Sequence, residues 1–436
     1  MMRQGGGPSG GKAVCIKNLA CQLTGMAKDY ELYFMLNGHR TVDEAARSDF
    51  VVIVGCAFSQ AKMEFATRYI EQIRSKIAPD ARIVLLGCLP RIESERMSSD
   101  GRLIIAKDDA ELDAIFSTKY KIADVGGCNL SEDAYRDPFL KLQNSDEFHT
   151  YYWPLYRLAF AKNGLASWSG HAALSLVRQC QRLCGLLREP GKKEYVIVAQ
   201  SGCGRACAYC AIRRGLGPLK SKPVDMILAE FDRGLSRGHR RFKLRCSDIG
   251  QYGADNGDSP LQLLRALLAH EGDYTVGIRH VHPQWLLENL EEIRALVSGG
   301  RISFLSVPIQ SGSQRVLRFM NRDYDISRLT EALRSLPARP GRFWLTTDVI
   351  VGFPSETDED FQMTLGALDA VGFAQVNCYP YSDRPGTRSA GYPGKIAPEV
   401  IARRMSVLKK KFFLSRLRRT MKELLRPLRF SAAPSS

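Results

Sequence analysis

Long apolar runs are missing from this sequence of 436 residues. No stretch of about 18 uninterrupted apolar residues, the length that spans a bilayer, occurs in it. Residues 1–12 are rich in glycine, predict a disordered segment and contain no hydrophobic core of the kind that secretory signals need. We therefore expect a cytoplasmic protein that neither crosses a membrane nor has a membrane partner.

Paired zinc ligands are also scarce, although the chain has 12 cysteines and 7 histidines. Residues 196–210 predict a short β-branched strand followed by a glycine-containing loop. That loop carries three closely spaced cysteines: Cys203, Cys207 and Cys210. A zinc site would take a fourth ligand from a nearby pair, but the next candidates, His239 and Cys246, form none. A structural zinc loop or chance spacing is the weaker interpretation.

Three thiolates on one loop suit an iron-sulfur cluster that keeps one iron open for a small molecule. The spacing, with Tyr209 directly before the last cysteine, resembles the signature of the radical S-adenosylmethionine (SAM) superfamily. This resemblance implies a 4Fe-4S cluster that is chelated by the amino and carboxyl groups of SAM. It also implies that the cluster reduces SAM to a 5′-deoxyadenosyl radical.

The N-terminal region alternates between predicted strands and helices. Strands are expected at residues 13–19, 50–54 and 82–86, and helices at residues 30–36 and 61–76. The alternation predicts a small doubly wound α/β domain over residues 13–122. In such domains ligands gather beyond the carboxyl ends of the strands.

A single cysteine follows each of the three predicted strands: Cys21, Cys56 and Cys88. Cysteines in such places are more often small buried hydrophobic residues than ligands. Because the carboxyl ends of parallel strands meet at one edge, these three cysteines would also suit a second iron-sulfur cluster. In a chain without an export signal, cysteines favour metal ligation over disulfides. We favour the cluster, a preference that leans on the family resemblance below.

From residue 194 the alternation of strands and helices resumes. Strands are expected at residues 242–244, 275–278, 302–307 and 342–351, and helices at 224–234, 261–270, 285–297, 313–320 and 358–371. The pattern predicts a partial parallel (β/α) barrel over residues 194–395, with its active site at the carboxyl ends of the strands. We expect residues 123–193 to be an irregular linker or insertion and residues 396–436 to be a basic helical tail.

The net charge of +16 and a pI near 9.4 suit a polyanionic partner such as RNA. Much of the excess lies in residues 402–430, where Glu423 is the single acid. A charge run of this kind is as readily explained by a solvated helix face as by contact with nucleic acid. Charge alone therefore leaves the partner open.

Further motifs extend along most of the chain. They are residues 20–23, 53–57, 86–89, 213–215, 220–223, 247–255, 308–313, 320–322, 347–357 and 381–387. With them the chain resembles the radical SAM methylthiotransferase family, whose best-known members modify an adenosine in tRNA or an aspartate of a ribosomal protein. The resemblance implies an N-terminal α/β domain with an auxiliary cluster, a radical SAM partial barrel and a C-terminal TRAM domain.

Carried over by position, the resemblance assigns the auxiliary 4Fe-4S cluster to Cys21, Cys56 and Cys88. It assigns the SAM cluster to Cys203, Cys207 and Cys210, and places SAM contacts at Tyr209, Gln310, Ser311 and Asp348. Asp348 also stands out by itself, because an acid in an apolar strand is costly to bury unless it faces a polar pocket. The implied reaction uses a radical to remove a hydrogen atom and the second cluster to supply a methylated sulfur. A flavodoxin-like or ferredoxin-like protein would donate electrons to a monomeric enzyme.

The sequence departs from the family pattern at several places. Thr24 stands where the family usually has Asn, Val54 and Gly55 stand where it has Asn-Thr, and no TRAM domain fits after residue 387. We therefore expect the substrate to be a peptide or a small metabolite, with tRNA as the alternative. A radical SAM enzyme with one cluster and a zinc-stabilised RNA-binding protein are less favoured interpretations of the same sequence.

Overall fold

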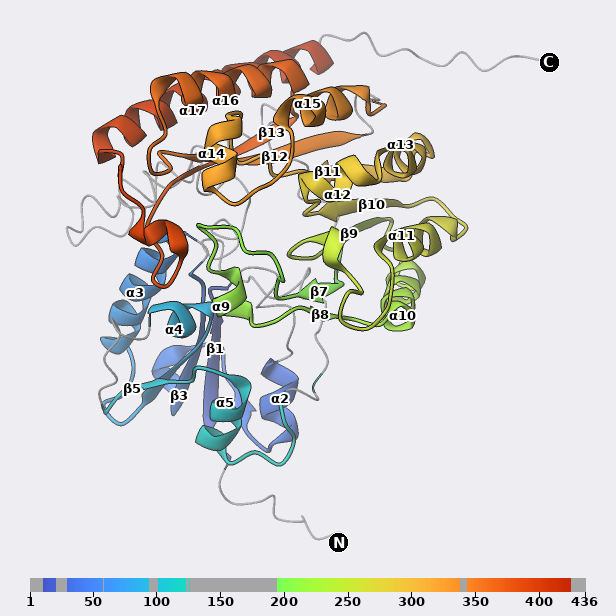
Figure 1. Cartoon of the computed structure of the whole chain (residues 1–436). Helices are drawn as coiled ribbons and strands as arrows, with labels where there is room; N and C mark the ends of the chain where they lie inside the picture. The colour runs from blue at the N-terminus through green and yellow to red at the C-terminus, as the bar shows by residue number, and fades with distance from the viewer. Residues whose placement is uncertain are drawn as a thin grey trace, which may run out of the picture.

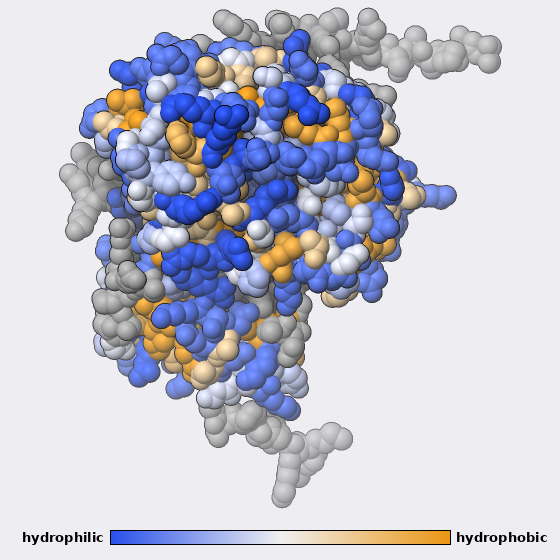
Figure 2. Space-filling model, in the orientation of Figure 1, coloured by the Kyte–Doolittle hydropathy of each residue, from blue (hydrophilic) through white to orange (hydrophobic). Residues whose placement is uncertain are grey.

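The computed structural model describes residues 11–20, 30–57, 59–93, 101–122, 125, 194–337 and 343–424. Figure 1 shows an N-terminal lobe, in blue to cyan, and a barrel lobe, in green to red. Hydrophilic residues predominate over both lobes on the face in Figure 2. Cys21, Thr24 and almost all of residues 123–193 lie outside the described residues, so the expectations placed on them stay predictions.

The N-terminal lobe is built on a parallel five-stranded sheet with the order β2-β1-β3-β4-β5. Its strands are β1 (Ala13–Asn18), β2 (Arg40–Thr41), β3 (Phe50–Gly55), β4 (Arg82–Gly87) and β5 (Leu103–Ile105). Its helices are α2 (Tyr30–Leu36), η1 (Ala45–Arg47), α3 (Gln60–Arg74), α4 (Cys88–Glu93) and α5 (Asp109–Phe116). Alternate residues of β3 enter two apolar clusters, one on each face of the sheet, which explains its continuous apolar sequence.

The barrel lobe is built on a parallel six-stranded sheet with the order β13-β12-β11-β10-β9-β6. Its strands are β6 (Tyr195–Val198), β9 (Arg241–Arg245), β10 (Thr275–Arg279), β11 (Ile302–Ser306), β12 (Trp344–Val351) and β13 (Gln375–Pro380). A short antiparallel pair, β7 (Gln200–Ser201) and β8 (Lys220–Ser221), lies beside the cysteine loop. Successive strands are neighbours in space, and the mixed α/β architecture confirms the predicted fold class.

Helices separate the strands of the barrel lobe. They are α9 (Ile212–Leu216), α10 (Val224–Ser236), η4 (Ile249–Gln251), α11 (Pro260–Ala269), α12 (Pro283–Glu288), α13 (Leu290–Ser298), α14 (Gln314–Phe319), α15 (Ile326–Ser335), α16 (Asp358–Val371), η5 (Arg388–Gly391) and α17 (Pro398–Leu424). The prediction of a single helix over residues 285–297 is wrong, because the helix is interrupted at Asn289. The Asn289 side-chain amide donates to the Trp285 carbonyl at 2.9 Å and ends α12, so a new helix starts after it.

The first half of α17 belongs to the barrel lobe. Met405 and Leu408 are buried in the barrel's apolar core, and the helix packs on β12 and β13. Arg404 forms a buried ion pair with Glu356 at 2.8 Å, so part of the basic run serves packing rather than a solvated face. Within the described residues, no helix combines the length and apolar character needed to cross a membrane.

Candidate active site

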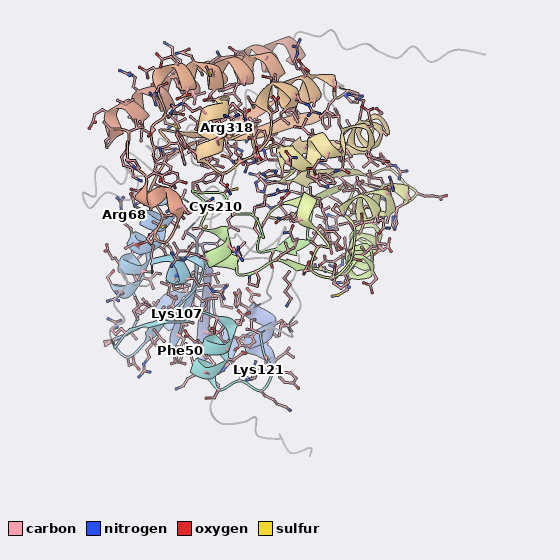
Figure 3. The ribbon with its side chains drawn as sticks, viewed as in Figure 1. Phe50, Arg68, Lys107, Lys121, Cys210 and Arg318 are labelled. Atoms are coloured by element: carbon pink, nitrogen blue, oxygen red, sulfur yellow. The ribbon has the colours of Figure 1, made fainter. Side chains whose placement is uncertain are left out.

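A cavity of about 260 Å³ lies where the two lobes meet. Cys56 and Cys88 line it from the N-terminal lobe, and Cys203, Cys207 and Cys210 line it from the loop after β7. Figure 3 places Cys210 at this junction between the lobes. Both predicted cysteine sets therefore face one space, as far as the described residues go, since Cys21 lies outside them.

Hydrogen-bond donors reach all three sulfurs of the cysteine loop. The Cys203 sulfur accepts from the Arg205 amide at 3.4 Å, and the Cys210 sulfur accepts from the Ile212 amide at 3.5 Å. The third sulfur, that of Cys207, lies 3.7 Å from a guanidinium nitrogen of Arg322. Such donors stabilise thiolates and tune the potential of a cluster that thiolates hold.

Burial raises the pKa of Cys203, and raises the pKa of Cys210 to about 12. Burial therefore keeps these thiols neutral and poorly nucleophilic while no metal is bound, and ligation by a cluster would displace their protons. In the described part of the chain, no three His, Cys, Asp or Glu side chains converge tightly enough to hold one metal ion. The three loop sulfurs line the same cavity.

The motif at residues 247–255 holds the cysteine loop in place. Asp248 is buried, and its carboxylate accepts from the Arg205 guanidinium at 2.5 Å. The Gln251 side-chain oxygen accepts from the Gly204 amide at 2.9 Å and from the Cys203 thiol at 3.5 Å. This motif therefore positions the loop from the neighbouring strand end.

Arg322 is a site residue to which sequence reasoning gave no role, although the motif at residues 320–322 contains it. Its side chain is buried and donates to the Tyr209 hydroxyl at 3.3 Å and to the Pro308 carbonyl at 3.0 Å, besides contacting Cys207. The preceding Asn321 has a left-handed backbone and donates to the Ala206 carbonyl at 2.9 Å. The Asn-Arg pair after a short helix was the available signal.

Acceptor groups from β12 and from the segment after β11 line the cavity. Gln310 is buried with a backbone φ of 62°, and its side-chain oxygen has no hydrogen-bond partner among the described residues. Asp348 accepts from the Asn377 amide at 2.8 Å and lies 3.7 Å from the His280 ring. A carboxylate and an unpaired amide oxygen suit the amino and hydroxyl groups that SAM carries.

On the other side of the cavity, strand pairing brings two of the single cysteines together. Gly55 pairs with Gly87 across β3 and β4, so Cys56 and Cys88 leave adjacent strand ends. Gly215 of α9 touches this site, because a Cβ atom there would lie 3.1 Å from the Cys88 Cβ and 3.2 Å from its sulfur. Glycine therefore lets α9 pack against the auxiliary cysteines.

The structure also explains the departure at residues 54 and 55. Val54 is fully buried in an apolar cluster. A Cβ atom on Gly55 would lie 2.9 Å from the Leu89 Cβ, so α4 packs too closely for the larger residue that the family usually has there. Apolar packing replaces polar side chains at these two positions.

Comparisons with known proteins agree with this arrangement. The family described as "Radical SAM superfamily" matches residues 197–368, and "Uncharacterized protein family UPF0004" matches residues 13–105. The threonylcarbamoyladenosine tRNA methylthiotransferase MtaB of Thermotoga maritima is 27% identical over 92% of this chain and 82% of its own length. The chain belongs to the radical SAM methylthiotransferase family.

Two further methylthiotransferases and one solved structure complete the comparison. The ribosomal protein uS12 methylthiotransferase RimO of Thermodesulfovibrio yellowstonii is 27% identical over 84% of this chain and 74% of its own length. The tRNA-2-methylthio-N(6)-dimethylallyladenosine synthase of Nitratidesulfovibrio vulgaris is 36% identical over 48% of this chain and 46% of its own. The radical SAM methyltransferase TsrM of Kitasatospora setae shares the fold, with a TM-score of 0.52, 13% identity and coverage of 87% of this chain and 74% of TsrM.

Membership in the radical SAM methylthiotransferase family makes this chain an enzyme that uses SAM and a 4Fe-4S cluster. Of the predicted SAM contacts, Tyr209, Gln310 and Asp348 line the cavity. The fourth, Ser311, is fully buried, and its hydroxyl accepts from the Ser313 amide at 3.2 Å and lies 3.3 Å from the Thr364 hydroxyl. In this position Ser311 shapes the turn that presents Gln310, and its assignment as a SAM contact stays a prediction.

Proposed function

We propose that this enzyme uses two 4Fe-4S clusters to convert an unreactive C–H bond of its substrate into a methylthioether. The observation that carries this proposal is the shared cavity, which Cys56 and Cys88 line from one lobe and Cys203, Cys207 and Cys210 from the other. When bound, the clusters would supply an electron for SAM cleavage and the sulfur for transfer. An electron donor of the flavodoxin or ferredoxin type would complete the system.

The residues of the chain account for the other requirements of this reaction. Gln310 and Asp348 offer acceptors that would orient SAM beside the cysteine loop, and Arg322 and Asp248 hold that loop. The cavity lies between the two lobes, so residues of both lobes would face the bound cofactors. Cys21, as the third ligand of the auxiliary cluster, rests on the family resemblance.

The substrate that we propose is a peptide or a small metabolite. Identity to the tRNA-modifying relatives reaches 36% over about half of the chain but falls to 27% over nearly all of it. A relative named for a polypeptide substrate, the ribosomal protein uS12 methylthiotransferase, is as similar to this chain over most of its length, at 27% identity over 84% of it. The second candidate is an adenosine in tRNA, favoured by the net charge of +16 and by the names of those relatives.

A paired measurement tests both levels of the proposal. Anaerobic protein with SAM and dithionite should release 5′-deoxyadenosine, and failure to do so would reject radical SAM chemistry. Mass spectrometry of bulk tRNA nucleosides from a deletion strain and its parent then tests the substrate. Unchanged nucleosides support a peptide or metabolite. Loss of a 2-methylthioadenosine derivative that only this gene restores would instead establish tRNA.

A further inference from the structure

Arg384 reaches from the barrel lobe to the N-terminal lobe. Arg384 follows β13 and belongs to the motif at residues 381–387. It is buried, with 7% of its surface exposed, and it lines the cavity. One guanidinium nitrogen donates to the sulfur of Met63, in α3, at 3.0 Å. Met63 belongs to the apolar core of the N-terminal lobe, so this arginine spans the junction between the two cysteine sites.

The Arg384 guanidinium is a buried cation that forms no close ion pair among the described residues, although the buried side chain of Glu93 attracts it. Its one hydrogen bond goes to a neutral thioether, and no carboxylate among the described residues forms an ion pair with it. Asp383, its neighbour in the chain, instead pairs with Lys395 at 2.5 Å. Burying a guanidinium without a close ion pair costs free energy, and negative charge inside the cavity would add to the attraction of Glu93 and offset this cost.

Cysteines of both sets lie within electrostatic reach of this cation. Burial lowers the pKa of Arg384, while attraction to Glu93, Cys56 and Cys210 acts in the opposite direction. Cys56 belongs to the auxiliary site and Cys210 to the SAM-cluster site. Thiols are neutral, but they become anionic when they bind iron, so ligation would place negative charge on both sides of the guanidinium, in addition to that of Glu93.

The loop that carries Arg384 is fixed in its position. Gly386 has a backbone φ of 71°, and a Cβ atom there would lie 1.7 Å from a guanidinium nitrogen of Arg214. The same nitrogen of Arg214 donates to the Pro385 carbonyl. Because Arg214 lies in α9, directly after the cysteine loop, the Arg384 loop and the cysteine loop are joined. The guanidinium is therefore held between both sites.

We propose that Arg384 is a positioning residue shared by the two cysteine sites, whose positive charge stabilises the thiolate-bound clusters on both sides of the cavity. The inference rests on the proposed two-cluster function. A cation beside a cluster favours its reduced, more negative state and so raises its reduction potential. Arg384 would thus set the potentials of both clusters, and its charge rather than its hydrogen bond to Met63 would matter.

The test compares four variants by iron analysis and by redox titration followed with electron paramagnetic resonance. R384Q removes the charge and R384K keeps it, while Met63→Leu removes the sulfur acceptor and Arg265→Gln removes a cation on the surface pair with Glu292. We expect both cluster potentials to become more negative in R384Q and to stay near the wild-type values in the other three. Wild-type potentials in R384Q at full iron content would overturn the inference.

If R384Q loses iron, the iron content of R384K decides between the two explanations. Restored iron in R384K supports a need for charge, whereas equal loss in both variants shows a requirement for the guanidinium shape and overturns the charge proposal. Wild-type protein with about four irons per chain would instead reject the two-cluster function. In that case the potential of the single cluster at Cys210 would still show whether Arg384 acts on it.

Discussion

The two lobes place cysteines at the carboxyl ends of parallel strands in different ways. The barrel lobe has all three on one loop, at Cys203, Cys207 and Cys210, whereas the N-terminal lobe presents Cys56 and Cys88 from separate strands. A local loop can be recognised from spacing alone. The separated cysteines become a site only through the pairing of β3 with β4, so the sheet topology creates that half of the cavity.

The lobes also differ in what surrounds their sulfurs. The barrel lobe lines the cavity with charged and polar groups such as Asp248, Gln310, Arg322 and Asp348. The lining from the N-terminal lobe includes Ala57 and Ile92 as well as Lys62 and Ser59. The barrel side therefore offers more groups that can orient a polar organic ligand.

The largest expected effect lies on the barrel side of this comparison. Replacing Cys207 by Ala should abolish reductive SAM cleavage, because the cluster would lose one of three protein ligands. Cys378→Ala is the matched control, since Cys378 is buried in β13 of the same lobe. Release of 5′-deoxyadenosine is the measurement. Wild-type release by the Cys207 variant would show that this loop does not hold the SAM cluster.

A second variant acts where the lobes touch. Gly215→Val should force α9 away from Cys88, at a cost of about 1–3 kcal/mol in stability for the overpacking. We expect iron to fall more than SAM cleavage does, because the strain falls on the auxiliary side. Gly366→Ala in α16 is the control, since nothing lies within 4 Å of its added Cβ atom. Equal loss of iron in both variants would show that the close contact between Gly215 and Cys88 is not the cause.

The smallest effect is expected within the barrel lobe alone. Burial raises the pKa of Asp360, but hydrogen bonds from Arg315, Ser313 and Thr357 outweigh it and hold the pKa at about 2. Asp360→Asn should therefore lower the free energy of unfolding by about 1–3 kcal/mol at neutral pH, as measured by urea denaturation. The exposed Glu331→Gln should leave it unchanged.

The contribution of Asp360 to stability should also depend on pH. A carboxyl whose folded pKa is lowered stabilises the protein above its unfolded pKa, which is near 3.8. This contribution is lost as the pH falls from there towards about 2. The difference in stability between wild type and Asp360→Asn should shrink over that range. If the difference in stability stayed constant over this pH range, the ion pair between Asp360 and Arg315 would contribute little.

The sequence was sufficient where the pattern is local. Strands β3 and β4 are marked by apolar runs, and α16 was predicted with its observed bounds. The structure shows a capping box at Thr357–Asp360 and a C-cap at Gly372 that fix its two ends. Strand β13 was missed, since Gln375 and Asn377 interrupt its apolar pattern. Their polarity is explained only by the tertiary contact in which Asn377 donates to Asp348.

The candidate site divides in the same way. Cys203, Cys207 and Cys210 could be found from spacing, but the buried positions of Arg322 and Arg384 could not, because each depends on loops distant in sequence. Both arginines lie in motifs, at residues 320–322 and 381–387, but those motifs do not show that the side chains are buried. Burial of a charged side chain, which carries the physical argument, is visible only in three dimensions.

Iron and acid-labile sulfide analysis of anaerobically purified protein tests the two-cluster account most directly. The account predicts about eight of each per chain, as two four-iron clusters require. In a variant that carries both Cys56→Ala and Cys88→Ala, it predicts about four of each, with SAM cleavage retained. Cys15→Ala, in the same sheet, should keep the wild-type content. About four irons in the wild type, unchanged in the double variant, would contradict the account.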